Sequence, residues 1–350
     1  MRLLVVGGGS AGHVLPARPV MQHYLDQGDE VIFVGTRSGL EESLVEDLQV
    51  SFHGISAGKL RRYLSWQNLI DTMRVALGVV ESIILLARVR PNVVFSKGGF
   101  VSFPVVLAAW LWRVPVVAHE SDFSPGLANR LVRPFVKTFC VSFKETEVAG
   151  HSRVVHSGTP IRSEILKGDA EAGRKLLGVD EAKPLLVITG GSLGADALNT
   201  IVRASLDVLL EEYYVVHVVG KGKSTSLDKL GYLQFEYVGE GWGDILAAAD
   251  RVISRAGANA LFELFALRKL CLLVPLSQVA SRGDQLENAV FAAQEGLAVV
   301  IEEDALDAES LAESLEVLVN KESEIRARLQ AFVLPDAAAT IVSEIDALGA

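Results

Sequence analysis

Cysteine and long apolar runs are scarce in this 350-residue chain. Its two cysteines, Cys140 and Cys271, stand among apolar residues and have no His or Cys at metal-ligand spacing, which predicts reduced core thiols in a cytosolic protein. Apolar stretches such as residues 105–112 fall well short of the roughly 18 residues that cross a bilayer. The chain opens directly on a predicted strand and a glycine loop, so we expect no signal peptide and only peripheral contact with a membrane.

Positive charge is also scarce overall, and it is unevenly spread. The net charge is −10, with 17 Lys and Arg against 13 Asp and Glu up to Ser163, and 16 against 30 after it. Binding to a nucleic-acid duplex requires clustered cations that neutralise phosphates, so the acidic second half argues against nucleic acid as a partner. The mildly basic first half is suited instead to an anionic lipid surface.

Half of the residues are hydrophobic, and short β-branched runs alternate with helix-length periodic segments. This alternation is typical of βαβ units and parallel sheets. We therefore expect an α/β protein with two Rossmann-like parallel-sheet domains that face a cleft. Buried strands are predicted at 2–6, 31–35, 92–96, 115–118 and 138–142, and in a second series at 185–189, 215–219, 251–254, 270–274 and 297–301.

Gly and Pro break the pattern at residues 157–162, which places the domain boundary there. The first domain is predicted to span 1–162 and the second 163–334. A final helix is expected over about residues 335–350. Its periodicity leaves open whether this helix packs against the first domain.

The first predicted strand leads into Gly7-Gly-Gly9-Ser-Ala-Gly12-His13, a G-x-G-x-x-G spacing that a helix is expected to follow. Such glycines let the backbone approach a ligand, and helix N–H groups point at its phosphates. A nicotinamide enzyme should place an acidic residue at the end of the next strand, about 20 residues further on. The sequence there is Phe33-Val-Gly-Thr-Arg37, so NAD is disfavoured, and NADP held by Arg37 remains a weaker alternative.

Three more segments contain glycine directly after a predicted strand. Residues 190–194 (GGSLG) favour a second site for a phosphate-sized anion, with a tight turn as the alternative. Residues 96–102 (SKGGFVS) either shape a substrate site or merely turn the chain. Residues 222–224 (GKS) look like the end of a P-loop, but the Walker pattern needs glycine at position 217, which is His217, so ATP hydrolysis by this route is not expected.

Seven motifs occur in one order along the chain: GGGSAGH, SKGGFVS, HESDFSPGLAN, GTPIR, GGSLGA, SRAGANALFE and DQLENA. In this set and order the chain resembles the MurG family over essentially its whole length. The resemblance implies a GT-B fold and an inverting transfer of N-acetylglucosamine from UDP-N-acetylglucosamine (UDP-GlcNAc). The implied acceptor is lipid I, undecaprenyl-pyrophosphoryl-MurNAc-pentapeptide, which becomes lipid II in peptidoglycan synthesis at the cytoplasmic face of the cell membrane.

The resemblance implies a donor site mainly in the second domain. Glu263 would accept hydrogen bonds from the ribose, with an ordinary solvated glutamate as the alternative, while Gln285 and Asn288 would bind sugar hydroxyls. Trp242 belongs to the segment that walls the uracil, with a core tryptophan as the alternative. The diphosphate would be bound by Arg162, Ser192 and the amides around Gly191. The full implied donor set is Arg162, Gly191, Ser192, Trp242, Ala258, Asn259, Glu263, Gln285 and Asn288.

The resemblance places the acceptor site in the first domain. His13, at the start of the expected helix, is the candidate general base for the acceptor hydroxyl, because neutral imidazole titrates near physiological pH. A role in orienting the loop is the alternative. The full implied acceptor set is Ser10, Ala11, Gly12, His13, His119, Asp122 and Asn129.

Three positions depart from the family pattern. Ser10 and Ala11 stand where Thr and Gly are usual, and alanine tolerates positive φ poorly. Asp122 replaces an amide in the usual HEQN sequence, so a group that donates and accepts becomes a carboxylate. Leu193 stands where glutamine is common.

No Asp-x-Asp pair occurs in the chain. That pair is the usual carboxylate ligand of a metal bound to a nucleotide diphosphate, so we expect a reaction that uses no metal and no other cofactor. Glycine-loop amides, helix N-termini and Arg162 are expected to balance the charge of the leaving group.

Basic and large apolar residues mix at 59–66, 83–86, 110–113 and 133–137 in the first half. Such a mixture can seat a protein on anionic lipid, with helix core and ordinary solvated charges as the alternative. Other functions left open are another GT-B enzyme, such as an epimerase or a glycolipid transferase, a sugar-nucleotide sensor that transfers nothing, and an NADP-dependent oxidoreductase.

Overall fold

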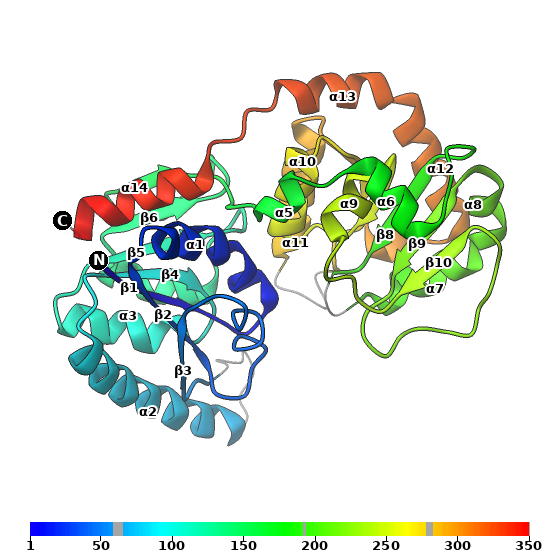
Figure 1. Cartoon of the computed structure of the whole chain (residues 1–350). Coiled ribbons are helices and arrows are strands. Elements are labelled where there is room, and N and C mark those ends of the chain that lie inside the picture. Colours follow the sequence, from blue (N-terminus) through cyan, green and yellow to red (C-terminus); the bar gives the residue numbers. More distant parts are fainter. Residues whose placement is uncertain (59–65, 192–193, 278–282, 350) are drawn as a thin grey trace. The chain divides into compact units, whose positions relative to one another are not determined.

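The computed structural model describes residues 1–58, 66–191, 194–277 and 283–349. The chain divides into two compact units, Met1–Arg162 with Pro335–Ala350, and Ser163–Leu334 (Figure 1). Each unit contains its own parallel sheet and its own helices.

The first unit is built on a parallel sheet whose strand order, in the described residues, is β3-β2-β1-β4-β5-β6-β7. Leu3 of β1 lies opposite Val31 of β2 and Val93 of β4. These strands are apolar at nearly every position because helices cover both faces of the sheet. The strands are β1 (Arg2–Gly7), β2 (Glu30–Thr36), β3 (Ser51–Ile55), β4 (Val93–Gly98), β5 (Val116–Glu120), β6 (Thr138–Val141) and β7 (Val154–His156).

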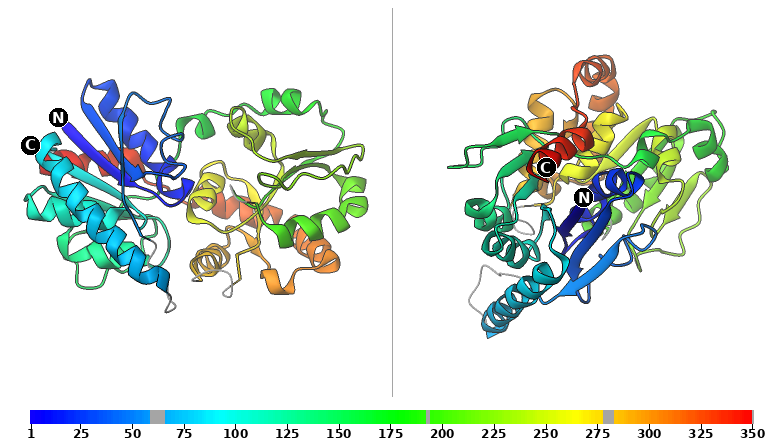
Figure 2. Two further views of the ribbon diagram at one scale, coloured as in Figure 1. Left: turned by 90° about the horizontal axis from the view of Figure 1, so that it is seen from below. Right: turned by 60° about the vertical axis from the view of Figure 1, so that its left-hand side comes forward.

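Two helix layers cover the two faces of this sheet (Figures 1 and 2). Successive side chains of a strand point to opposite faces, so Leu4 and Val6 pack with one layer and Leu3 and Val5 with the other. The first layer contains α2 (Trp66–Val89), α3 (Ser102–Leu111) and α4 (Leu127–Val132), and the second contains α1 (Arg18–Asp26) and α14 (Ala337–Gly349).

The last helix, α14, is part of the first unit. The Tyr24 hydroxyl of α1 donates to Asp346 at 2.7 Å, and burial together with this bond raises the pKa of Tyr24. Arg153 and Glu344 form an ion pair at 2.8 Å. The buried face of the helix consists of Ile341, Val342 and Ile345.

The second unit repeats this plan with strand order β10-β9-β8-β11-β12-β13 in its described residues. Val187 of β8 lies opposite Val216 of β9 and Val252 of β11. The strands are β8 (Leu185–Thr189), β9 (Tyr214–Val218), β10 (Tyr232–Phe235), β11 (Arg251–Ser254), β12 (Leu270–Leu273) and β13 (Val299–Val300). The helices are α5 (Ser163–Leu166), α6 (Ala170–Leu177), α7 (Asp196–Ala204), α8 (Leu206–Glu212), α9 (Trp242–Ala248), α10 (Ala258–Ala266), α11 (Asp284–Gln294), α12 (Ala308–Asn320) and α13 (Glu322–Ala331).

The two predicted parallel sheets are confirmed, and every predicted buried strand is present. Three strands were not predicted, namely β3, β7 and β10. All three lie at sheet edges, where one side of the strand lacks a partner and side chains stay partly exposed. Their sequences therefore lack the continuous apolar run that marks a buried strand.

The helix expected directly after the first glycine loop begins later than predicted. Two short 3₁₀ helices, η1 (Ala11–His13) and η2 (Leu15–Ala17), come first, and α1 begins at Arg18. Pro16 and Pro19 lack an N–H and are suited to the first turn of a helix, so they divide this segment into short turns. His13 thus ends a 3₁₀ turn, and its predicted place at the start of a helix was wrong.

Both cysteines are buried and unpaired, as predicted. Burial raises the pKa of each thiol to about 12, so both stay protonated at neutral pH. Among the described residues, no helix combines the length and the apolar character that a crossing of the bilayer requires.

Candidate active site

In open parallel sheets, ligand sites lie beyond the carboxyl ends of the strands. In the first unit, the loop after β1 is held there by Glu41, which is 2% exposed. The Gly9 amide donates to its Oε1 at 2.8 Å, and the Thr36 hydroxyl donates to the same carboxylate at 2.9 and 3.1 Å. A Cβ at Gly8 would lie 2.4 Å from Glu41 Oε1, so a side chain there would displace this carboxylate. Sequence analysis did not identify this carboxylate.

His13 lies where three loops of the first unit meet. Ser10 Oγ is 2.9 Å from His13 Nδ1. A Cβ built on Gly98, at the end of β4, would lie 3.4 Å from His13 Cδ2 and 3.7 Å from Asn129 Nδ2. Gly98 has φ of +102°, which also favours glycine. The structure therefore brings together Ser10, His13 and Asn129, which the motifs grouped.

Ala11 causes no backbone strain in this loop. It lies in η1, and among the described residues the non-glycine residues with positive φ are Arg90, Arg113 and Arg268. Gly12 is its neighbour in the same turn. The replacement of the family's usual glycine is therefore compatible with the loop.

Glu120 is a buried carboxylate at the end of β5. It accepts hydrogen bonds from the Asp122 amide at 3.0 Å, the Gly126 amide at 2.7 Å and Asn129 Nδ2 at 2.9 Å. Desolvation raises its pKa, and the nearby charge of Asp122 adds to this rise, while the three donors oppose it. Asn129 is itself buried and also donates to the His119 carbonyl.

His119 is completely buried beneath these groups. Its Nε2 is 2.9 Å from the Gly158 carbonyl oxygen, so this nitrogen donates. Burial lowers the pKa of His119 well below its usual range, and the nearby charge of Lys97 lowers it further. His119 therefore stays neutral and links β5 to the segment that follows β7.

Lys97 is the second buried residue that sequence analysis did not single out. It is 1% exposed at the end of β4, and its ammonium group donates to Ser121 Oγ. Desolvation lowers its pKa from the usual 10.5 to about 8, and the charges of Glu120 and Asp122 oppose this fall. A lysine at the ligand end of a buried strand was the available signal. We call His13, Lys97, Glu120, Asp122 and Asn129 the first-unit cluster.

Arg37, the cation that the NADP alternative requires, is 61% exposed and already paired within the first unit. Its guanidinium forms an ion pair with Glu81 at 2.6 Å and donates to the Gly54 carbonyl at 3.3 Å.

Arg162, the last residue before the second unit, is partly buried.

In the second unit, the glycine loop runs from β8 to α7. Gly190 and Gly194 are packed against Ala195 and Val219, and a side chain at either would collide with backbone. Gly191 instead has open space at its Cβ position, φ of +79°, and an amide that donates to Thr189 Oγ1 at 3.2 Å. Ser192 and Leu193 lie outside the described residues.

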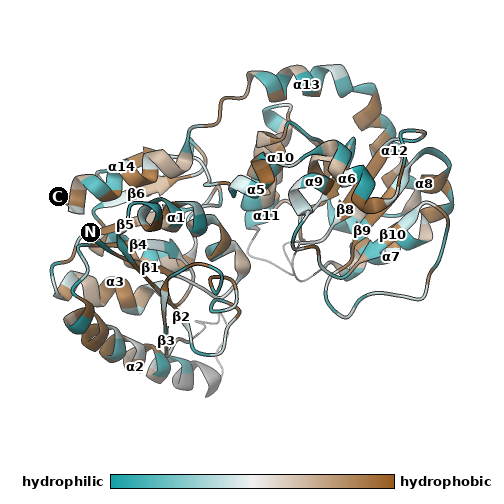
Figure 3. Cartoon of the chain, in the orientation of Figure 1, coloured by the Kyte–Doolittle hydropathy of each residue, from teal (hydrophilic) through white to brown (hydrophobic). Residues whose placement is uncertain are grey.

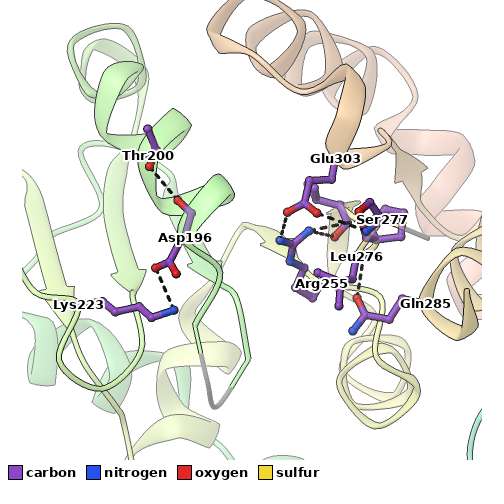
Figure 4. Close-up of polar contacts among 10 residues, drawn as sticks. Asp196, Thr200, Lys223, Arg255, Leu276, Ser277, Gln285 and Glu303 are labelled. Carbon is purple, nitrogen blue, oxygen red and sulfur yellow. Dashed lines mark hydrogen bonds and ion pairs between the residues drawn. The ribbon is translucent and has the colours of Figure 1, made fainter. Parts of the chain in front are cut away.

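Helix α7 begins at Asp196, whose carboxylate forms an ion pair with Lys223 at 2.9 Å (Figure 4). This pairing is the observed role of the P-loop-like lysine. Deeper in the unit, His217 Nε2 lies 2.9 Å from Asn199 Oδ1, and its Nδ1 lies 3.0 Å from the Tyr232 hydroxyl. Burial lowers the pKa of His217 to about 4, so it remains a neutral link between α7 and the sheet.

The SRAGANALFE motif spans the end of β11 and α10. Asn259 and Glu263 are four residues apart on α10, so they share one face of the helix, and both are partly exposed. Ala258 is the buried first residue of this helix. Arg255, which sequence analysis passed over, is buried in an ion pair with Glu303 and donates to the Val274 carbonyl at 3.1 Å (Figure 4).

Helix α11 contains the two amides of the DQLENA motif. Gln285 Oε1 accepts a hydrogen bond from the Leu276 amide at 3.0 Å (Figure 4). Asn288 is completely buried, and its Nδ2 donates to the Ala256 carbonyl at 3.0 Å. Trp242 is the first residue of α9 and is only partly buried, which does not fit a core tryptophan.

Comparison with known proteins connects both units to one enzyme group. The family model for the glycosyltransferase family 28 N-terminal domain matches residues 3–141, and the model for the C-terminal domain of the same family matches residues 185–341. A Legionella pneumophila (strain Lens) protein is 44% identical over 347 residues, covering 98% of this chain and 96% of its own. A Clostridium kluyveri protein is 43% identical, covering 99% of both chains. Both are named UDP-N-acetylglucosamine–N-acetylmuramyl-(pentapeptide) pyrophosphoryl-undecaprenol N-acetylglucosamine transferase.

Solved structures agree with this grouping at the level of the fold. The crystal structure of Acinetobacter baumannii MurG matches with a TM-score of 0.77 at 23% identity, over 99% of each chain. UDP-GlcNAc 2-epimerase from Neisseria meningitidis matches with a TM-score of 0.72 at 13% identity, over 99% of this chain and 100% of its own. The fold is therefore of the GT-B type. The chain belongs to the MurG family within glycosyltransferase family 28.

Proposed function

We propose that the chain transfers N-acetylglucosamine from UDP-GlcNAc to lipid I and so produces lipid II for peptidoglycan synthesis. The observation that carries this proposal is identity of 43–44% over nearly the whole length to relatives named for this reaction. The aligned region covers 96–99% of those relatives and includes both units of this chain, which supports the proposal.

The second unit is proposed to bind the donor. Glu263 would accept from the ribose hydroxyls, since it shares an exposed face of α10 with Asn259. The Gln285 carbonyl is bound to Leu276, so its NH₂ group is the end that would donate to a sugar hydroxyl. Asn288 would position Ala256 and the start of α10, because it is buried and bonded to that backbone. Trp242 would wall the uracil.

The diphosphate is proposed to lie at the glycine loop before α7. Gly191 supports this because space beside it is open, and Ser192 is its neighbour in sequence. Arg162 would add a positive charge. Donors fixed in advance at a developing charge often contribute about 10²- to 10³-fold each, so this set offers a route for the leaving group without a metal.

The first unit is proposed to bind the acceptor around Ser10, Ala11, Gly12, His13 and Asp122. His13 would remove the proton from the attacking sugar hydroxyl, and Ser10, bonded to Nδ1, would leave Nε2 as the basic nitrogen. His119 and Asn129 are buried, so we propose that they hold the site rather than contact the sugar.

Contact with an anionic membrane surface is proposed for α2 and α3 of the first unit. Met73, Leu77, Val80 and Ile84 are 46–68% exposed, and their spacing of four, three and four residues puts them on one face. Hydrophobic residues occur along much of α2 (Figure 3). Trp110, Leu111 and Trp112 are also exposed, at and directly after the end of α3. We call these seven residues the apolar face. Of residues 83–86, only Ile84 belongs to it, because Leu86 lies in the core. Residues 59–65 lie outside the described residues.

The test is transfer of labelled N-acetylglucosamine from UDP-GlcNAc to a short-chain lipid I analogue in the presence of a chelator. We expect a disaccharide product at the rate seen without chelator. Glu263→Gln should raise the KM for UDP-GlcNAc, whereas Glu287→Gln, an exposed neighbour on α11, should not. Absence of product would refute the proposed reaction, and loss of product only with chelator would refute its independence of metal.

A further inference from the structure

The first-unit cluster contains a buried cation, Lys97, whose removal from water costs free energy. Lys97 lies at the end of β4, between β1 and β5, and is 1% exposed. Lysine is almost never fully buried, because its ammonium group gives up strong hydration. Within the described residues, the hydrogen bond to Ser121 Oγ is the one that this group makes. Such a cost suggests a role that an apolar side chain of similar size would not fill.

Ser121, which binds this ammonium, lies between Glu120 at the end of β5 and Asp122 in the loop after it. Glu120 is buried and accepts three N–H bonds, a pattern that suits the ionised form. Asp122 is partly buried, and its charge raises the pKa of Glu120. The ammonium group of Lys97 is a cation that both carboxylates attract.

The other titratable groups described around Lys97, His119 and His13, do not supply a positive charge that could offset the two carboxylates. His119 is buried and neutral, and Lys97 itself holds the pKa of this residue down. His13 lies across Gly98 and is the proposed base, so it must be neutral before it accepts a proton. Lys97 is therefore the charged group that is placed, through Ser121, next to both Glu120 and Asp122.

We infer that Lys97 is a positioning residue of the acceptor site, whose ammonium group balances Glu120 and Asp122 together and, through Ser121, fixes the segment that bears Asp122. This inference rests on the proposed function, because the acceptor is the ligand that the segment would meet. It makes Lys97 and Asp122 a matched pair: removal of the cation alone should be more harmful than removal of both charges.

The test compares Lys97→Met, Asp122→Asn and the double variant Lys97→Met/Asp122→Asn, with Lys144→Met as an exposed-lysine control. Lys97→Met should lower kcat/KM for the lipid I analogue about 10- to 100-fold, as expected for coupled neighbours. It should also move the acidic limb of the pH profile upward, because loss of a cation raises the pKa of the remaining acids. The double variant should recover activity and return the limb toward its original pH.

A second readout does not depend on turnover. The pKa of Lys97 falls from 10.5 to about 8 on folding, so the folded state binds fewer protons than the unfolded state between these pH values. Burial also lowers the pKa of Lys269 to about 8 and raises the pKa of both thiols to about 12, so the readout is the difference between the two proteins. The melting temperature of the wild type relative to that of Lys97→Met should rise with pH across this window. This measurement keeps its meaning even if the wild type fails to transfer the sugar.

Three results would overturn the inference. Lys97→Met with wild-type kcat/KM and pH profile would show that the cation is dispensable. A double variant no more active than Lys97→Met would show that Lys97 acts by direct contact with substrate. A difference in melting temperature between wild type and Lys97→Met that stays constant from pH 8 to 10.5 would show that Lys97 is not a desolvated cation in the folded chain.

Discussion

Exposure to water separates two kinds of residue at the carboxyl end of the first sheet. Ser10 is exposed and His13 partly so, while His119, Glu120 and Asn129 are buried and bonded to one another or to backbone. An imidazole that substrate can reach is able to exchange a proton with it. Buried groups are able only to fix geometry and charge. This difference in exposure supports the proposal that His13, and not His119, is the base.

His13→Ala should lower kcat by about 10²- to 10⁴-fold, the usual contribution of a general base, while the affinity for UDP-GlcNAc changes little. Ser10→Ala should have a smaller effect, because it removes only the hydrogen bond that orients the ring. The measurement is steady-state transfer to the lipid I analogue, with His53→Ala on the exposed strand β3 as control. Near-wild-type turnover of His13→Ala would mean that another group takes the proton.

Motifs located these side chains, but the sequence did not reveal their surroundings. The burial of His119 depends on the Gly158 carbonyl, and that of Asn288 on Ala256, contacts made 39 and 32 residues away. Lys97 follows the predicted buried strand 92–96, but nothing in the sequence places it near Glu120 on the neighbouring strand. The motifs therefore provide candidate residues, whereas the contacts of the buried layer could not be predicted.

At the scale of elements, the central strands were predictable because coverage on both faces makes them apolar throughout. Three of the four edge strands in the described sheets, β3, β7 and β10, were not predicted, because their pairing comes from the sheet and not from their own pattern. β3 (Ser51–Ile55) contains Ser, His and Gly, residues that also occur in loops. The 3₁₀ turns before α1 were also not predicted. The G-x-G-x-x-G spacing led us to expect a helix directly after the loop, whereas Pro16 and Pro19 divide this segment into short turns.

The apolar face of α2 and α3 leads to a prediction about membrane binding. Leu77→Ser/Ile84→Ser should weaken binding to anionic vesicles at low salt by at least about tenfold, because burial of each such side chain is worth roughly 1.5–3 kcal/mol. Cosedimentation with phosphatidylglycerol vesicles measures it. Val208→Ser, an exposed apolar position in the second unit, should bind as the wild type does. Wild-type protein that ignores such vesicles would remove the proposed membrane contact.

At the scale of the whole molecule, α14 closes the core of the first unit. The periodicity of residues 337–349 predicts an amphipathic helix, but it does not identify the surface that the helix covers. In the structure, Ile341 and Ile345 pack in the same core as Met21 and Tyr24 of α1. Long-range placement of this kind depends on complementary shape, which a single sequence does not display.

Ile345→Ala should destabilise the first unit by about 2–5 kcal/mol, the usual cost of a cavity at a buried isoleucine. Calorimetry or denaturant unfolding should show the loss, with Ser343→Ala, exposed on the same helix, as control. An unchanged unfolding transition would mean that α14 contributes little to this core.

Membership of α14 in the first unit also has a consequence for biosynthesis. Residues 163–334 form one continuous segment, so the second unit has all its strands as soon as that segment has left the ribosome. The first unit, although translated first, still lacks the helix that covers Tyr24 and Cys140. The nascent chain must therefore keep an open apolar surface until residues 337–349 have been synthesised, and the order in which the two units begin is the reverse of the order in which they are completed.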